Sequence, residues 1–284
     1  MRSDSMRWLW LVLALALVAP VARAQMGGMG GMGSPPPAPK GSGEDLIPDI
    51  DPSVAKDPNK SFARGEQEFK EHNWLDAIAY YRHVMQTFAY DVPLAAKAEL
   101  RLGDVAFERE KYGQARGYYK NFVRFHPGNP QADYAAYRVG LSAFKEIPGD
   151  LFFEPPSIEK DQTEVLDALA ASRDFVQRFP TSQYVPEAKK VIAKCDEKLA
   201  GHELYVARFY QSRGKWKGVV LRADGLVRRY PESKLAPEAL YLLTRAHLKL
   251  HDKPAAQRDV AQLAQLAPKA KWTKKAQEAL AKAR

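Results

Sequence analysis

Apolar residues recur three or four positions apart from about residue 60 to the end of the chain. This is the spacing of helices that bury one face. No stretch alternates apolar and polar residues over the length of a strand, and no Asn-Gly turn joins two such stretches. The pattern therefore predicts an all-α fold.

One connector sequence occurs twice. RFPTSQYVPEA at residues 178–188 returns as RYPESKLAPEA at residues 229–239. In each copy an apolar helical run stops at Pro180 or Pro231, because proline lacks the amide that a continuing helix needs. A second proline, Pro186 or Pro237, has the fixed φ that suits the first turn of a new helix. We interpret the phrase as the link between consecutive helix pairs.

Small and aromatic positions also recur at a fixed interval. Gly65, Ala77 and Tyr81 align in register with Gly103, Ala115 and Tyr119. The glycine lets the first helix of a pair approach the second closely at the alanine, and the aromatic residue fills the space between neighbouring units. This spacing resembles the tetratricopeptide (TPR) repeat, so we expect a TPR-type superhelical solenoid of about five helix-turn-helix repeats with a C-terminal capping helix.

The predicted repeat domain covers residues 59–284. Its repeats are expected at about 59–90, 93–127, 130–180, 185–231 and 235–268, with the cap at 271–284. The third repeat carries an insertion between Gly140 and Ala168, within a stretch rich in helix-breaking proline and glycine.

The amino-terminal part of the chain differs in composition from the rest. Residues 1–24 have the basic start, the apolar run and the Ala-Arg-Ala site of a secretory signal peptide, and an uncleaved membrane anchor is the alternative. Residues 25–58 are rich in glycine, proline and acidic residues, which predicts a disordered linker. We therefore expect an exported protein.

The net charge of +9 is concentrated at the carboxy-terminal end. Residues 201–284 hold 18 basic and 7 acidic side chains. Such a surface suits an acidic partner or an anionic membrane, a solvated lysine-rich helix face is an equal alternative, and export argues against nucleic acid. The single cysteine, Cys195, lies among apolar residues and is expected to be buried.

Aromatic residues recur at equal phase on the predicted first helices of the repeats. The six positions of this aromatic stripe are Phe62, Phe69, Leu100, Phe107, Tyr137 and Phe144. On the inner wall of a solenoid they would hold an extended peptide by burying its apolar side chains. The alternative is that they fill space between neighbouring helices.

The residues offer little support for catalysis or cofactor binding. His247 and His251 share a helix face, but no third ligand accompanies them, so we expect no metal. No Gly-x-Ser-x-Gly elbow occurs, and the glycines of residues 27–33 lack the Lys-Ser/Thr of a phosphate loop. We expect a protein that is not an enzyme and has no cofactor.

Several segments in order resemble the BamD family, the TPR subunit of the outer-membrane β-barrel assembly machine. They are HPGNPQADYAAYRVG at 126–140, FVQRFPTSQYVPEA at 175–188, and YVARFYQSRGKW at 205–216, the last being the most discriminating. The resemblance covers residues 60–267. It departs at one point, since family members are usually lipoproteins and no cysteine lies near Ala24.

The resemblance implies a function in binding other proteins. The carboxy-terminal repeats would contact the POTRA domains of BamA, with Arg213, Trp216 and Arg222 as candidate contacts, and other subunits of the machine would be further partners. The amino-terminal repeats would bind unfolded outer-membrane proteins at the aromatic stripe. The protein would lie in the periplasm, peripherally associated with the inner face of the outer membrane. The alternative is another periplasmic TPR adaptor that coordinates cell-envelope or division proteins.

Overall fold

The computed structural model describes residues 47–149 and 161–283, and every regular element in these ranges is an α-helix. The helices are α1 (Pro58–Lys70), α2 (Trp74–Thr87), α3 (Val92–Glu108), α4 (Tyr112–Phe125), α5 (Ala132–Glu146), α6 (Thr163–Arg178), α7 (Val185–Ser212), α8 (Trp216–Arg229), α9 (Ala236–Lys249), α10 (Lys253–Leu266) and α11 (Lys271–Lys282). The all-α prediction is confirmed.

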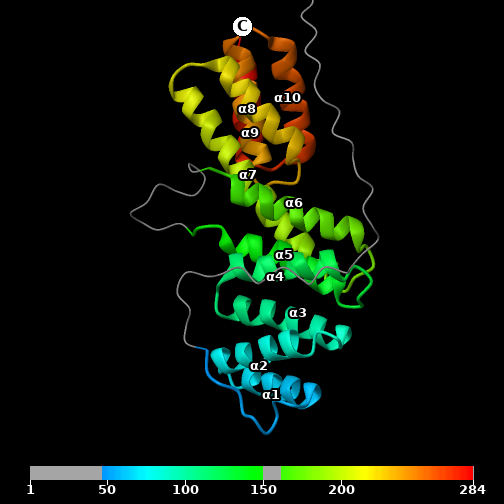
Figure 1. Cartoon of the computed structure of the whole chain (residues 1–284). Coiled ribbons are helices and arrows are strands. Elements are labelled where there is room, and N and C mark those ends of the chain that lie inside the picture. Colours follow the sequence, from blue (N-terminus) through cyan, green and yellow to red (C-terminus); the bar gives the residue numbers. More distant parts are fainter. Residues whose placement is uncertain (1–46, 150–160, 284) are drawn as a thin grey trace, which may run out of the picture. The chain divides into compact units, whose positions relative to one another are not determined.

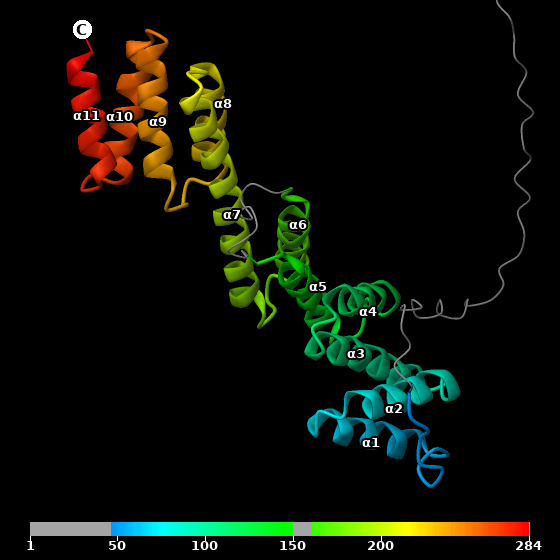
Figure 2. The same ribbon diagram turned by 90° about the vertical axis from the view of Figure 1, so that its left-hand side faces the viewer.

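The helices pack in consecutive pairs (Figures 1 and 2). α1 packs on α2, α3 on α4, α5 on α6, α7 on α8 and α9 on α10, while α11 covers α9 and α10. First helices of neighbouring pairs also touch, as in α1 with α3 and α5 with α7. Over the described part of the chain, this confirms a TPR-type solenoid of five helix pairs with a capping helix.

The duplicated connector has the predicted role in both copies. α6 ends at Arg178 and α7 begins at Val185, with Pro186 in its first turn. α8 ends at Arg229, and α9 carries Pro237 in its first turn. Each first proline follows the helix end by two residues, so the proline chemistry sets where the pairs begin and end.

The glycine positions bring helices together as the repeat pattern predicts. A Cβ placed on Gly65 would lie 2.9 Å from the ring of Tyr81, and one on Gly103 would lie 2.8 Å from the ring of Tyr119. Both tyrosine rings are fully buried, as are Ala77 and Ala115. Only a residue without a Cβ permits this approach.

The core consists of successive local clusters rather than one central mass. One cluster joins side chains of α7 to α11, and a second joins α5, α6 and the first half of α7. Cys195 belongs to the second cluster and is 0% exposed, which confirms its predicted burial. Stability therefore comes from contacts between neighbouring helix pairs.

Residues 51–57 pack against the first helix pair, although their composition suggested a linker. Tyr80 accepts a hydrogen bond at its hydroxyl from the Asp51 amide (3.2 Å), and Ser61 donates one to the Val54 carbonyl (2.8 Å). The His83 ring lies 2.8 Å from the Ala55 carbonyl oxygen. The signal peptide, the linker up to residue 46 and most of the insertion, residues 150–160, lie outside the described residues.

Candidate protein-binding surfaces

The aromatic stripe lies on α1, α3 and α5, the first helices of three consecutive pairs. Leu100 is 2% exposed and belongs to the core. The other five members, Phe62, Phe69, Phe107, Tyr137 and Phe144, are half-buried. These five thus combine contacts within the domain with some surface left open.

A cation from the next first helix covers three of the stripe's rings. The Arg101 guanidinium lies 5.5 Å from the centre of the Phe69 ring. Arg138 lies 3.7 Å from the Phe107 ring, and the Lys194 ammonium lies 5.7 Å from the Phe144 ring. Cations at such distances are attracted by the negative face of the ring.

The stripe's remaining aromatic residues also contact rings of their own chain. The ring centre of Phe62 is 5.6 Å from that of Tyr81. Tyr137 stacks on Tyr184, with ring centres 5.1 Å apart. These side chains therefore join neighbouring helices and keep a partly open surface, and the peptide-binding role of the stripe stays a prediction.

Beside the stripe runs a ladder of carboxylates, tyrosines and arginines, which sequence reasoning missed. Glu66 of α1 accepts hydrogen bonds from the Tyr81 hydroxyl (2.6 Å) and from Arg101 (2.8 Å). Asp104 of α3 occupies the equivalent position in the next repeat. It accepts bonds from the Tyr119 hydroxyl (2.7 Å) and the Tyr134 hydroxyl (2.8 Å).

Arginines connect the rungs of this ladder. Arg101 also donates to Asp104 at 3.0 Å, and Arg138 donates to the Tyr119 hydroxyl at 3.0 Å. The signal that would have found the ladder is the sequence spacing of Glu66 and Asp104, which equals that of their tyrosine partners. A polar pair at constant repeat spacing indicates that the same contact between the two helices of a pair recurs in successive repeats.

Burial makes the ladder tyrosines permanent donors. Burial, followed by the hydrogen bond to Glu66, raises the pKa of Tyr81 far above its ordinary value. Burial and the charge of Asp104 raise the pKa of Tyr119 and of Tyr134 in the same direction. The hydroxyls therefore stay protonated at all physiological pH values and remain hydrogen-bond donors to the carboxylates of the ladder.

The predicted partner contacts lie at the turn between α7 and α8 and just beyond it. Arg213 is exposed at the end of α7, with its guanidinium 4.4 Å from the centre of the Phe209 ring, which is 44% exposed. Trp216 begins α8 and packs, half-buried, against the carboxy-terminal core. Arg213 and Phe209 thus form an exposed cation–aromatic pair.

Arg222 differs from Arg213 because it is engaged within the domain. It donates to Glu203 at 3.3 Å, and Arg229 pairs with the same carboxylate. Glu203 is only 7% exposed, so the two arginines compensate a buried charge. Removing Arg222 would therefore disturb the packing of α7 on α8 as well as any partner contact.

The described ranges contain no cluster of three or more His, Cys, Asp or Glu side chains that could hold a metal ion. His247 lies 2.7 Å from Asp259 of the neighbouring helix, and His251 has a left-handed backbone (φ 61°) just beyond the end of α9. None of the helices in the described part of the chain combines the length and apolar character needed to cross a bilayer.

Known proteins are similar to this chain over most of its repeat domain. A family model described as "YfiO: Outer membrane lipoprotein" matches residues 54–263. The chain is 29% identical over 211 residues to "Outer membrane protein assembly factor BamD" of Caulobacter vibrioides, covering 74% of this chain and 66% of the relative. It is 30% identical over 200 residues to the protein of the same name from Neisseria meningitidis serogroup B, covering 69% and 73%.

A solved structure of another protein is also similar. This is the "TPR2AB-domain:pHSP90-complex of yeast Sti1", with a TM-score of 0.39 and 14% identity, covering 78% of this chain and 84% of that one. The assignment of the fold rests on the helix packing described above.

Proposed function

Because this chain belongs to the outer-membrane lipoprotein family YfiO, we propose that it is a non-catalytic scaffold subunit of the machinery that assembles β-barrel proteins in the outer membrane. The observation that carries the proposal is the match of the family model to residues 54–263, together with relatives named as assembly factors. The relatives extend beyond the matched region, which spans 66% of the first and 73% of the second.

The amino-terminal repeats are proposed to bind unfolded outer-membrane proteins. The half-buried rings of Phe69, Phe107 and Phe144 offer apolar surface at regular intervals, and the cations that cover them offer positive charge for a chain-terminal carboxylate. A peptide that ends in an aromatic residue has both the ring and the carboxylate that such a surface attracts.

The peptide proposal is tested by photo-crosslinking. A peptide ending in phenylalanine and carrying a benzophenone is irradiated with the full chain. Phe107→Ala combined with Phe144→Ala should reduce crosslinking at least about thirtyfold, since each lost contact is expected to weaken binding by about 1 kcal/mol or more. Phe125→Ala is the matched control, because Phe125 is 39% exposed on α4, outside the stripe, and also has an arginine 4.7 Å from its ring centre. Equal crosslinking by all variants would remove this assignment.

The carboxy-terminal repeats are proposed to bind the POTRA domains of BamA and other subunits of the machine. The exposed pair of Arg213 and Phe209 is the sharpest candidate contact, because arginine and aromatic side chains are enriched among the few interface residues that carry most of the binding energy. Trp216 and Arg222 would support this surface from within α8. We further propose that the protein is periplasmic and held peripherally at the outer membrane by these partners.

A pull-down from envelope extract tests the partner. Arg213→Glu should release BamA from the full chain, whereas Lys274→Glu, which makes the same charge change at an exposed position of α11, should retain it. Arg213 is preferred to Arg222 for this test because Arg222 stabilises the domain through Glu203. Recovery of division or other envelope proteins without BamA would favour the adaptor alternative and overturn the proposal.

A further inference from the structure

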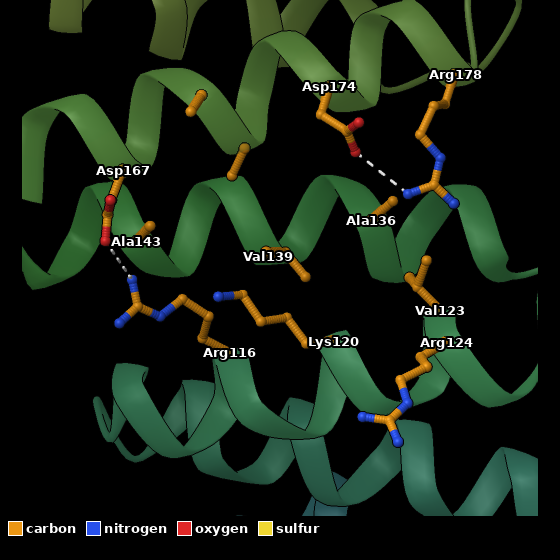
Figure 3. A pocket seen from close by; sticks show the side chains of 12 residues that line it. Arg116, Lys120, Val123, Arg124, Ala136, Val139, Ala143, Asp167, Asp174 and Arg178 are labelled. Carbon is orange, nitrogen blue, oxygen red and sulfur yellow. Dashed lines mark hydrogen bonds and ion pairs between the residues drawn. The ribbon is translucent and has the colours of Figure 1, made fainter. Parts of the chain in front are cut away.

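A cavity of about 560 Å³ lies between the second helices α4 and α6 (Figure 3). The aromatic stripe lies instead on first helices. α5 forms the floor of the cavity through Ala136, Val139 and Ala143. Every floor side chain is apolar and no larger than valine, so the channel between the flanking helices stays open. The volume lies within the range of about 300–1,000 Å³ that is typical of ligand sites.

The α4 wall of this cavity is basic. Arg116, Lys120 and Arg124 are four residues apart and therefore share one helix face. Figure 3 shows Lys120 reaching out beside Val139, with Arg116 on one side and Arg124 on the other.

Two of these three cations have no carboxylate partner within the described ranges. Arg116 pairs with Glu146 at 3.1 Å and lies 3.9 Å from Asp167. Lys120 and Arg124 are exposed and form no ion pair among the described residues. On the α6 wall, Arg178 is already neutralised by Asp174 at 3.2 Å. The unbalanced charge of the cavity is thus positive and lies on the α4 rim.

We propose that this cavity binds an extended acidic peptide segment of a partner protein. Arg116 and Arg124 are eight residues apart, or about 12 Å along the helix, a length that about four extended residues span. An extended chain directs alternate side chains to opposite sides. Small apolar side chains would then rest on the alanine and valine floor, while alternate carboxylates would meet Lys120 and Arg124 at the rim.

This inference is independent of the proposed assembly function, because it concerns α4 and α6 rather than the stripe or the α7–α8 turn. A free anion would use only the cations, whereas a peptide also uses the apolar floor. The combination of both features favours the peptide.

The test is fluorescence anisotropy with the full chain and a labelled eight-residue peptide in which aspartate alternates with alanine. Lys120→Glu combined with Arg124→Glu should weaken binding at least about tenfold at low ionic strength. Ala170→Trp should weaken it similarly without changing charge, because Ala170 is an exposed lining residue and a tryptophan there fills the channel. Lys249→Glu combined with Lys274→Glu is the control of equal charge at exposed positions outside the cavity.

Circular dichroism checks that each variant keeps its helices. The proposal is supported if both cavity variants lose binding, the control retains it, and the peptide with asparagine in place of aspartate binds at least about tenfold more weakly. An equal loss in the control pair would mean diffuse attraction to a basic protein and would overturn the proposal. Full binding by Ala170→Trp, or displacement of the peptide by phosphatidylglycerol vesicles, would also overturn the assignment of a peptide to this cavity.

Discussion

Two glycines inside helices have opposite environments. Substituting them by alanine therefore separates the effect of close packing from the effect of helix propensity. A Cβ on Gly103 of α3 would meet the Tyr119 ring at 2.8 Å, whereas one on Gly117 of α4 would meet nothing within 4 Å. Tyr119 is fully buried and bonded to Asp104, so its ring has no space to move. The same substitution should therefore have opposite effects at the two sites.

We predict that Gly103→Ala lowers the free energy of unfolding by about 1–2 kcal/mol, because overpacking outweighs the gain in helix propensity. Gly117→Ala should raise it by about 0.5–1 kcal/mol. Urea denaturation followed by circular dichroism measures both. A stabilised Gly103→Ala variant would contradict the close approach of α3 and α4.

The thiol of Cys195 should be unreactive in the folded protein. Burial, and then the charge of Asp196, raises its pKa to about 11. At pH 8 only about one thiol in a thousand would be ionised, and the side chain is fully buried. Reaction with Ellman's reagent at pH 8 should be at least about 100-fold slower in the native protein than in urea.

The sign of the pH effect follows from this raised pKa. Because the folded state favours the protonated thiol, its contribution to stability is full below pH 9 and is lost as the pH rises through 11. Native reactivity should accordingly increase over the same interval. A native thiol that reacts at pH 8 as fast as the unfolded one would show that Cys195 is accessible.

At the scale of elements, Asp104 joins three helices. It is 3% exposed and accepts hydrogen bonds from side chains of α3, α4 and α5, through Arg101, Tyr119 and Tyr134. Glu66 is the equivalent residue one repeat earlier, but its side chain is 24% exposed. Water can therefore accept part of the hydrogen bonds that Glu66 accepts, but few of those that Asp104 accepts.

We predict that Asp104→Ala lowers the free energy of unfolding by about 3–5 kcal/mol, because it leaves the buried Tyr119 hydroxyl and the partly buried Tyr134 hydroxyl without their acceptor and removes one of the two carboxylates that pair with Arg101. Glu66→Ala is the matched variant and should lower the free energy of unfolding by about 1–2 kcal/mol. Urea denaturation measures the difference. Equal losses in the two variants would mean that the burial of these carboxylates does not determine how much each of them stabilises the fold.

The sequence predicted the helix pairs far better than the contacts between them. Pro180, Pro186 and the glycine positions act through backbone geometry, so their effect can be read locally. The bond between Asp104 and Tyr134 joins residues 30 positions apart and depends on how α5 sits on α3. The α4–α6 cavity was missed for a similar reason, since its small floor residues have no distinctive pattern along the chain.

At the scale of the whole repeat domain, substantial contacts within its described ranges join only helices that are close neighbours in the sequence. Trp272 of the capping helix stacks on Tyr241 of α9, with ring centres 5.2 Å apart, and joins the carboxy-terminal cluster. Asp104 acts on α3 to α5. The described contacts of Trp272 and those of Asp104 share no side chain. A substitution at either residue should therefore destabilise only the helices next to it.

We therefore predict that Trp272→Ala and Asp104→Ala act independently. Hydrogen exchange should accelerate in α9 to α11 for the first variant and in α3 to α5 for the second, because each opens only the helices that it joins. In the double variant, the free energy of unfolding should fall by the sum of the two single-variant losses, to within about 0.5 kcal/mol. Uniform acceleration from α1 to α11 in either single variant would instead mean that the repeats unfold as one cooperative unit, and the nearest-neighbour description of this solenoid would fail.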